Sequence, residues 1–228
     1  MNTERSFSVE RRVEVHAALA DATRLRVVDL LAIGDAASSE LSALLDVSSN
    51  LLAHHLKVLE GAGVVERHRS EGDGRRSYWR LVPGVPGTSA GSSIAAPGRV
   101  VFVCTANTAR SHLAAALWRQ ASAIPATSAG THPAARIAPG ARAVARRHDL
   151  DLPDVPPQHL DDIAPAGDCD DLVITVCDLA HEELGAAARV HWSVPDPVAA
   201  GTRAAFDRAY DELAGRVRLL APRLDRAS

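Results

Sequence analysis

A cysteine, an arginine and a serine lie at a spacing suited to nucleophilic chemistry on an oxyanion. Cys104 follows the apolar stretch Val100–Val103, and Arg110 and Ser111 come six and seven residues later, before an Ala/Leu-rich stretch. This order predicts a strand, a loop and a helix, so the loop N–H groups and the positive helix end both face the thiol. A guanidinium matches the oxygens of a tetrahedral anion, and the same positive field favours thiolate over thiol. We therefore predict that Cys104 is a nucleophile.

The composition fits a globular protein with two small domains. The 228 residues are 46% hydrophobic and carry a formal net charge of −3. Residues 83–98 are rich in Pro, Gly, Ser and Ala and poor in large apolar side chains, which is typical of a flexible linker. The predicted domains are therefore residues 1–82 and 99–228.

The cysteines and the apolar runs indicate the compartment. No apolar run reaches transmembrane length, and the N-terminus lacks the hydrophobic core of a signal peptide. Cys104, Cys169 and Cys177 all follow the linker, which suits a reducing compartment where cysteine serves reactivity. We expect a cytoplasmic protein without a membrane partner, and we assign no residue to a metal.

The pattern of residues 1–82 predicts a mainly-α winged helix-turn-helix. Apolar residues recur at helical spacing, and two β-type stretches flank the Gly-containing turn at 71–74. Charge alone does not indicate nucleic-acid binding, because acidic and basic residues nearly balance in this segment. Helices are expected at 9–19, 21–31, 39–45 and 49–60, and strands at 64–69 and 75–81.

Residues 18–26 and 54–59, together with the wing, resemble the ArsR family of winged-helix repressors over residues 9–82. The resemblance implies a homodimer on a double-stranded DNA operator, with helix 49–60 in the major groove and the wing on phosphates. A helix-turn-helix used only for dimerisation is the alternative. The expected DNA contacts are Ser49, Asn50, His54, His55, Lys57, Arg67, Arg69, Arg75 and Arg76.

The effector of this domain is not expected to be arsenite. Soft trivalent arsenic prefers thiolate ligands, as soft ions do generally. Many ArsR relatives carry such thiolates before the recognition helix, but no cysteine precedes Cys104 in this chain.

Strand-like and helix-like stretches alternate over residues 99–228, which predicts an α/β domain with a parallel sheet covered on both faces. Such sheets bind ligands at the carboxyl ends of their strands, where Cys104 and Cys177 both lie. Cys169 lies at the opposite end of the same strand as Cys177, roughly 20 Å or more away, so only Cys104 and Cys177 can pair. Strands are expected at 99–103, 126–129, 171–176 and 190–194, and helices from 111, at 139–148 and at 203–220.

Residues 104–111, 128–131 and 194–197 resemble the low-molecular-weight protein tyrosine phosphatase superfamily, which has a flavodoxin-like fold and includes arsenate reductases. The resemblance covers residues 99–222 and implies that Cys104 is the nucleophile, Arg110 clamps the oxyanion and Asp196 is the acid/base carboxylate. Ala106 stands where the family usually has Gly, and Ala109 where a second Cys is common. The expected oxyanion-binding residues are Thr105, Ala106, Asn107, Thr108, Ala109, Arg110 and Ser111.

Two features indicate a reductase rather than a tyrosine phosphatase. Val198–Ala200 follow the Asp-Pro pair, where phosphatases tend to place aromatic residues, so a phenyl ring finds little to stack on. Cys177 stands where thioredoxin-coupled arsenate reductases have their first resolving cysteine, although residues such as Leu184 fill the segment that carries the second. A buried structural role is the alternative for Cys177.

We therefore predict a DNA-binding regulator fused to an arsenate reductase. Cys104 attacks arsenate, Cys177 or a small thiol resolves the adduct, and an external thiol reductant, thioredoxin-type or small, regenerates the enzyme. No bound cofactor is expected. The alternatives are a phosphatase that works through a phosphocysteine and a non-catalytic repressor that senses an oxyanion or the thiol redox state.

Overall fold

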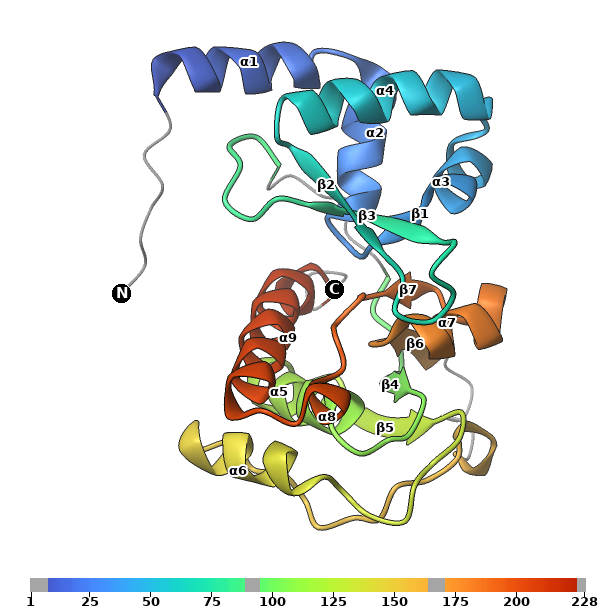
Figure 1. The fold of residues 1–228 in the computed structure, drawn as a ribbon, viewed down its shortest axis with the longest axis vertical. Coiled ribbons are helices and arrows are strands. Elements are labelled where there is room, and N and C mark those ends of the chain that lie inside the picture. The colour runs from blue at the N-terminus through green and yellow to red at the C-terminus, as the bar shows by residue number, and fades with distance from the viewer. Residues whose placement is uncertain (1–7, 89–94, 164–170, 225–228) are drawn as a thin grey trace. The chain divides into compact units, whose positions relative to one another are not determined.

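The chain folds into two compact units in the computed structural model, which describes residues 8–88, 95–163 and 171–224 (Figure 1). Cys169 and residues 89–94 of the predicted linker lie outside the described residues, and the boundaries 1–82, 83–98 and 99–228 stay predictions. Within the described ranges, no helix has both the length and the apolar character needed to cross a membrane.

The first unit is the predicted winged helix-turn-helix. Asp21 and Ser48 act as helix N-caps, since their side chains accept hydrogen bonds from the N–H groups of Arg24 and Leu51 at 2.9 and 3.4 Å. β2 and β3 form the antiparallel hairpin of the wing. The elements are α1 (Val9–Leu19), α2 (Ala22–Leu31), β1 (Ala36–Ala37), α3 (Ser38–Leu45), α4 (Ser49–Gly61), β2 (Val65–Arg69) and β3 (Ser77–Leu81).

The strand β1 is an addition to the predicted elements of this unit. It pairs antiparallel with β3 and gives the sheet order β1-β3-β2. Two alanines carry no β-type signal in the sequence, so only the ladder partner makes this segment a strand. The sheet closes a core in which Leu41, Leu52 and Leu59 are at most 1% exposed.

The second unit is the predicted α/β domain with a parallel sheet, in the strand order β5-β4-β6-β7. The register pairs Cys104 with Gly130 and Val103 with Thr175, so the carboxyl ends of three strands meet at one edge. The elements are β4 (Arg99–Cys104), α5 (Arg110–Ala121), β5 (Ala126–Gly130), α6 (Pro139–Arg147), η1 (Leu160–Asp162), β6 (Asp171–Thr175), α7 (Asp178–Leu184), η2 (Gly185–Ala187), β7 (Val190–His191), α8 (Pro197–Ala200) and α9 (Arg203–Leu224).

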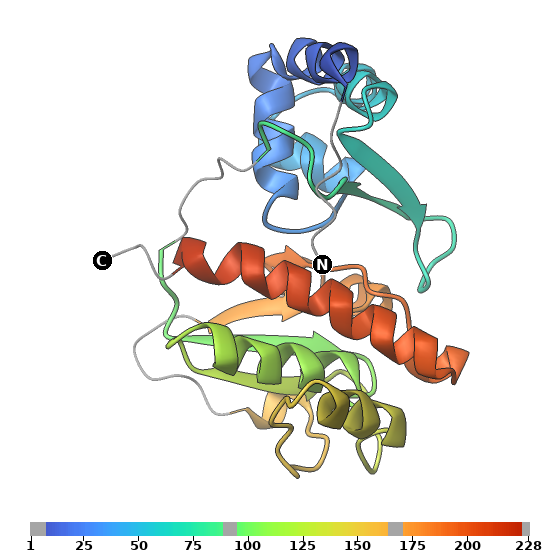
Figure 2. The same cartoon turned by 90° about the vertical axis from the view of Figure 1, so that its left-hand side faces the viewer.

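β4 is the central support of this unit. Its residues Val100–Val103 are at most 1% exposed, which is typical of a parallel strand covered on both faces. The Phe102 ring lies 5.8 Å from Trp118 on α5 and 5.6 Å from Trp192, which follows β7. α5 packs on β4 and β5, and α9 lies alongside α5 (Figure 2).

The region after β6 departs from the predicted elements. The strand expected at 190–194 is wrong in length, because its ladder stops at His191 and the following residues form the loop toward Asp196. The helices α7 and α8 were absent from the predicted set, since seven and four residues are too few to show helical periodicity. α7 packs against β4 and β6 and carries Cys177 at its start.

We predict that Phe102→Ala lowers the free energy of unfolding by about 3–5 kcal/mol, because it leaves a cavity between two tryptophans. Chemical denaturation of the full chain, followed by circular dichroism, measures the change. Leu219→Ala is the control, since Leu219 is 60% exposed and its loss should change stability by less than about 0.5 kcal/mol. Equal free energies of unfolding for the two variants would contradict the role of β4 as the central support of the second unit.

Candidate active site

The loop from Cys104 to Arg110 is held open by hydrogen bonds to its carbonyl oxygens. The N–H groups of Thr131 and His132 donate to the carbonyl oxygens of Cys104 and Thr105 at 3.1 and 2.8 Å. The N–H groups of Ala134 and Ala138 donate likewise to Ala106 and Thr108 at 3.0 and 2.9 Å. In a trans peptide the N–H points opposite to the C=O, so the N–H groups of the following residues point away from segment 131–138. That of Thr105 donates to Cys177 Sγ at 3.2 Å, and those of Ala106, Asn107 and Ala109 face the concave side of the loop. A concave row of N–H groups is an anion cradle.

Asn107 fixes the middle of this loop. Its φ of 49° is left-handed, a conformation that asparagine tolerates better than most residues. Its side chain donates to Ser111 Oγ at 2.8 Å and accepts from the N–H of Gln158 at 3.0 Å. Ser111 Oγ lies 3.1 Å from Cys104 Sγ, and because it accepts from Asn107, its own proton can point at the sulfur. This arrangement suits a sulfur that carries negative charge.

Ala106 and Gly130, two small residues of the loop and its neighbouring strand, are explained by two different features of the backbone. Ala106 has no positive φ, because the left-handed residue of the loop is Asn107, so alanine fits where the family usually has glycine. A Cβ at Gly130 would lie 2.6 Å from the carbonyl oxygen of Thr105. Gly130 is therefore required by the close approach of β5 to the loop.

Arg110 and Asp196 meet across the loop mouth. Arg110 is 8% exposed, its Nη1 donates to the carbonyl oxygen of Val194 at 2.8 Å, and its Nη2 lies 3.4 Å from Asp196 Oδ2. Asp196 Oδ1 accepts from the N–H of Val198 at 2.9 Å, so the carboxylate also caps α8. The pair places a carboxylate and a planar cation at the same opening.

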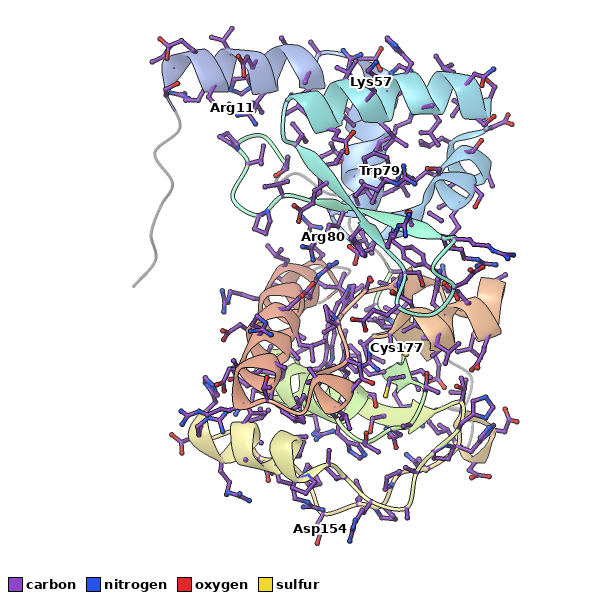
Figure 3. The ribbon with its side chains drawn as sticks, in the orientation of Figure 1. Arg11, Lys57, Trp79, Arg80, Asp154 and Cys177 are labelled. Atoms are coloured by element: carbon purple, nitrogen blue, oxygen red, sulfur yellow. The ribbon has the colours of Figure 1, made fainter. Side chains whose placement is uncertain are left out.

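Cys177 borders the same pocket as Cys104. It is 2% exposed and stands directly before α7 (Figure 3), and its Sγ accepts from the N–H of Thr105 at 3.2 Å. Burial raises the pKa of the Cys177 thiol, and the nearby charge of Cys104 raises it further. The pocket brings together the four predicted catalytic residues Cys104, Arg110, Asp196 and Cys177, and its other lining residues from the second unit include Thr105, Ala106, Thr108, Ala109, Asp178, Leu179, Ala199 and Ala200.

Several residues around the site were absent from the sequence-based prediction. Gln158 lies in an irregular segment, and its backbone role leaves no sequence signal. Asp178, His181 and His191 are buried polar residues close to Cys177: the first two lie on α7, and His191 ends β7. The position of Asp178 and His191 at the ends of apolar stretches is a signal that could have identified these two. His112 follows Ser111 and is no acid/base candidate at neutral pH, since burial lowers its pKa to about 4.

Eight of the nine predicted DNA-contacting residues are exposed, and His55 is not. Ser49, Asn50, His54 and Lys57 are exposed on α4, and Lys57 is labelled on its outer side in Figure 3. His55 is 6% exposed and its Nδ1 lies 3.6 Å from Asp21 Oδ1. His55 is buried because, at the helical spacing, it lies on the same inward face of α4 as the buried Leu52 and Leu59. The wing residues Arg67, Arg69, Arg75 and Arg76 are exposed.

Two family models match the chain. The model described as low molecular weight phosphotyrosine protein phosphatase matches residues 99–228, and the model described as bacterial regulatory protein, arsR family, matches residues 21–67. The transcriptional repressor SdpR of Bacillus subtilis (strain 168) is 34% identical over 67 residues, which make up 29% of this chain and 71% of that protein.

Solved structures match a little over half of the chain. An arsenate reductase from Archaeoglobus fulgidus is 27% identical, with a TM-score of 0.47 over 54% of this chain and 98% of that chain. A YwlE mutant from Bacillus subtilis is 23% identical, with a TM-score of 0.49 over 56% and 99% of the two chains. The YwlE arginine phosphatase from Geobacillus stearothermophilus is 25% identical, with a TM-score of 0.47 over 57% and 94%.

We predict that Gly130→Ala weakens binding of inorganic phosphate by about 100-fold, because the new Cβ pushes the loop off its geometry. Isothermal titration calorimetry measures the affinity. Gly215→Ala is the matched control, since a Cβ there meets nothing within 4 Å and lies in the interior of α9. Wild-type affinity in Gly130→Ala would show that the loop does not hold the anion.

Proposed function

Because the chain belongs to the low molecular weight phosphotyrosine protein phosphatase family and carries an ArsR-family helix-turn-helix ahead of that domain, we propose a DNA-binding regulator joined to a thiol-dependent arsenate reductase. One observation supports the reductase assignment over the phosphatase: a second thiol, Cys177, borders the pocket of Cys104 and is held by Thr105 of the anion loop. A phosphatase needs no second thiol, whereas reduction of arsenic by two electrons needs two.

In the first step of the proposed reaction, the loop N–H groups and Arg110 bind arsenate, a tetrahedral oxyanion. The Cys104 thiolate attacks arsenic and forms an S–As bond, while a hydroxyl group of the protonated arsenate takes a proton from the acid form of Asp196 and leaves as water. Arg110 and the inward N–H groups stabilise the charge that builds up on the remaining oxygens.

In the second step, the Cys177 thiolate attacks Cys104 Sγ. The S–S bond forms and the S–As bond breaks, and its electron pair stays on arsenic, which leaves as trivalent arsenite. A thioredoxin-type protein or a small thiol then reduces the disulfide by exchange. A small thiol that attacks the Cys104 adduct directly is the other route to the same products. No bound cofactor takes part in either route.

A phosphatase is the second candidate, because Cys104, Arg110 and Asp196 suffice for hydrolysis through a phosphocysteine and the matching family model is named for that activity. The opening of the pocket argues against an aryl substrate. Ala199 and Ala200 line it, and Val198 beside them is 42% exposed, so the side chains after Asp196 offer no ring for stacking.

For the first unit we propose that α4 reads the major groove of an operator and that the wing contacts phosphates. The exposed side chains of α4 and of the wing support this assignment. Val9 and Val13 on α1 are 68% and 62% exposed, and a homodimer would cover these apolar side chains. Such a regulator works in the cytoplasm, where operator DNA and reducing thiols are both present.

We predict that Cys104→Ser abolishes arsenite production, and that Cys177→Ser reduces it at least about 100-fold with a thioredoxin-type reductant, because no disulfide forms. Arsenite is quantified chromatographically, with thioredoxin-type and small-thiol reductants in parallel. Full activity of Cys177→Ser with both reductants would contradict the proposed resolving role. Hydrolysis of an aryl phosphate by Cys177→Ser, without arsenite production by the wild type, would favour the phosphatase.

We predict that Asn50→Ala costs about 1–3 kcal/mol of sequence discrimination, if α4 places this exposed residue against a base edge. Arg75→Ala should weaken specific and non-specific binding alike and reduce the salt slope by about one, because a phosphate contact releases counterions. Fluorescence anisotropy on a pseudo-palindromic duplex, across a salt series, measures both effects. Arg146→Ala, an exposed residue of α6, is the charge-matched control. If the DNA affinity changes neither with salt concentration nor with either substitution, this unit is a dimerisation module.

A further inference from the structure

A buried polar network lies next to Cys177, and the reaction proposed above does not use it. Thr175, Asp178, His181 and His191 are 0%, 4%, 7% and 2% exposed. Two of them, Thr175 and Asp178, are two residues before and one residue after Cys177 in the chain. Among the described residues, no group of three or more His, Cys, Asp and Glu side chains is arranged to hold a metal ion, so the network is not a metal centre.

His191 stands at the centre of this network. Its Nε2 lies 3.1 Å from Asp178 Oδ1, and its Nδ1 lies 3.0 Å from Thr175 Oγ1. The same Thr175 oxygen lies 3.2 Å from His181 Nδ1 and donates to the carbonyl oxygen of Val190 at 3.3 Å. The two imidazole rings are stacked, with 4.1 Å between their centroids and 9° between their planes. The ring of His191 is thus held on both edges and on one face.

The charge of Asp178 decides what the network can do. Burial raises the pKa of this carboxyl, but hydrogen bonds from His191 and Ser193 outweigh burial and lower the pKa to about 2. Asp178 is therefore a carboxylate at neutral pH, and His191 Nε2–H is the donor to it. A carboxylate this weakly basic is a poor acceptor for the proton of a buried thiol. The network is suited to positioning rather than to proton transfer.

The network connects the resolving thiol to the segment that holds Arg110. Asp178 is the first residue of α7, and Cys177 caps the same helix. His191 ends β7, and three residues later Val194 accepts the hydrogen bond from Arg110. Arg110 and Asp196 have their own mutual contact, so they do not depend on the Asp178–His191 hydrogen bond. Loss of that bond would remove one of the hydrogen bonds that hold Asp178 and so loosen the turn at Cys177, while the contact between Arg110 and Asp196 stays in place.

We propose that His191 is a positioning residue for the resolving thiol: through Asp178 it fixes the turn that presents Cys177 Sγ to Cys104 Sγ. The inference rests on the proposed reductase function and concerns its second step alone. A disulfide forms only at restricted separations and dihedral angles, so a small displacement of Cys177 slows S–S formation steeply. Binding of the oxyanion and attack by Cys104 do not require this contact.

The test separates the two steps in the full-length chain. Reduced protein is mixed with arsenate in the absence of any external thiol, and arsenite and the Cys104–Cys177 disulfide are quantified by rapid quench and mass spectrometry. The anion site is measured separately, as the protection by inorganic phosphate of Cys104 against alkylation by iodoacetamide. The variants are His191→Leu, which removes the donor to Asp178, and His191→Gln, whose amide N–H can replace it.

We expect His191→Leu to slow single-turnover arsenite release and disulfide formation by about tenfold or more, with phosphate protection of Cys104 within about twofold of wild type. His191→Gln should recover most of the rate. Wild-type rates in His191→Leu would overturn the inference, and so would a parallel loss of phosphate protection, because His191 would then support the whole sheet. If His191→Gln does not recover the rate of disulfide formation while phosphate protection is intact, the hydrogen bond to Asp178 is not what positions Cys177. Failure of the proposed function is a different result, namely no arsenite from the wild type.

Discussion

The orientation of the peptide groups in the loop after β4 is the constraint on which the site depends. Segment 131–138 donates four backbone hydrogen bonds to carbonyl oxygens of residues 104–108, at 2.8–3.1 Å. Had these carbonyl oxygens faced inward, the loop would repel an anion. Because they are turned outward and satisfied, the opposite faces of the peptides supply N–H groups without a desolvation penalty. The left-handed Asn107 and the absence of a side chain at Gly130 make this arrangement possible.

The sequence could predict that the residues of the loop after β4 lie together, because they are close in the chain. Cys104, Asn107, Arg110 and Ser111 lie within eight residues, between a buried strand and a helix, so spacing alone places them on one anion cradle. Likewise, the parallel order of strands follows from their alternation with helices. The fold class of both units is confirmed for the same reason, since long periodic helices and apolar strands carry strong local signals.

Contacts between distant segments explain what the sequence did not predict. The strand β1 exists only through its ladder with β3, and β7 is short because residues 192–196 serve the loop that reaches Arg110. His55 was predicted to contact DNA because it lies on the recognition helix. It shares the buried helix face of Leu52 and Leu59, however, so its side chain lies near Asp21 instead. The hydrogen bond from His191 to Asp178 joins residues that are 13 positions apart, and no pattern in the chain announces it.

The charges around the pocket also impose an order on the proposed steps. Asp196 and Asp178 both line the pocket as partnered carboxylates, since Arg110 Nη2 lies 3.4 Å from Asp196 and His191 Nε2 lies 3.1 Å from Asp178. Cys177 is different, because burial and the negative charge of Cys104 both raise its pKa. While Cys104 is a free thiolate, the second thiol is therefore held protonated and is a poor nucleophile. Once the sulfur of Cys104 is bonded to arsenic, its negative charge is shared among the arsenic-bound oxygens, which the loop N–H groups and Arg110 bind. The Cys104 sulfur is then an electrophile rather than a nucleophile, so attack by Cys177 can only follow the first step.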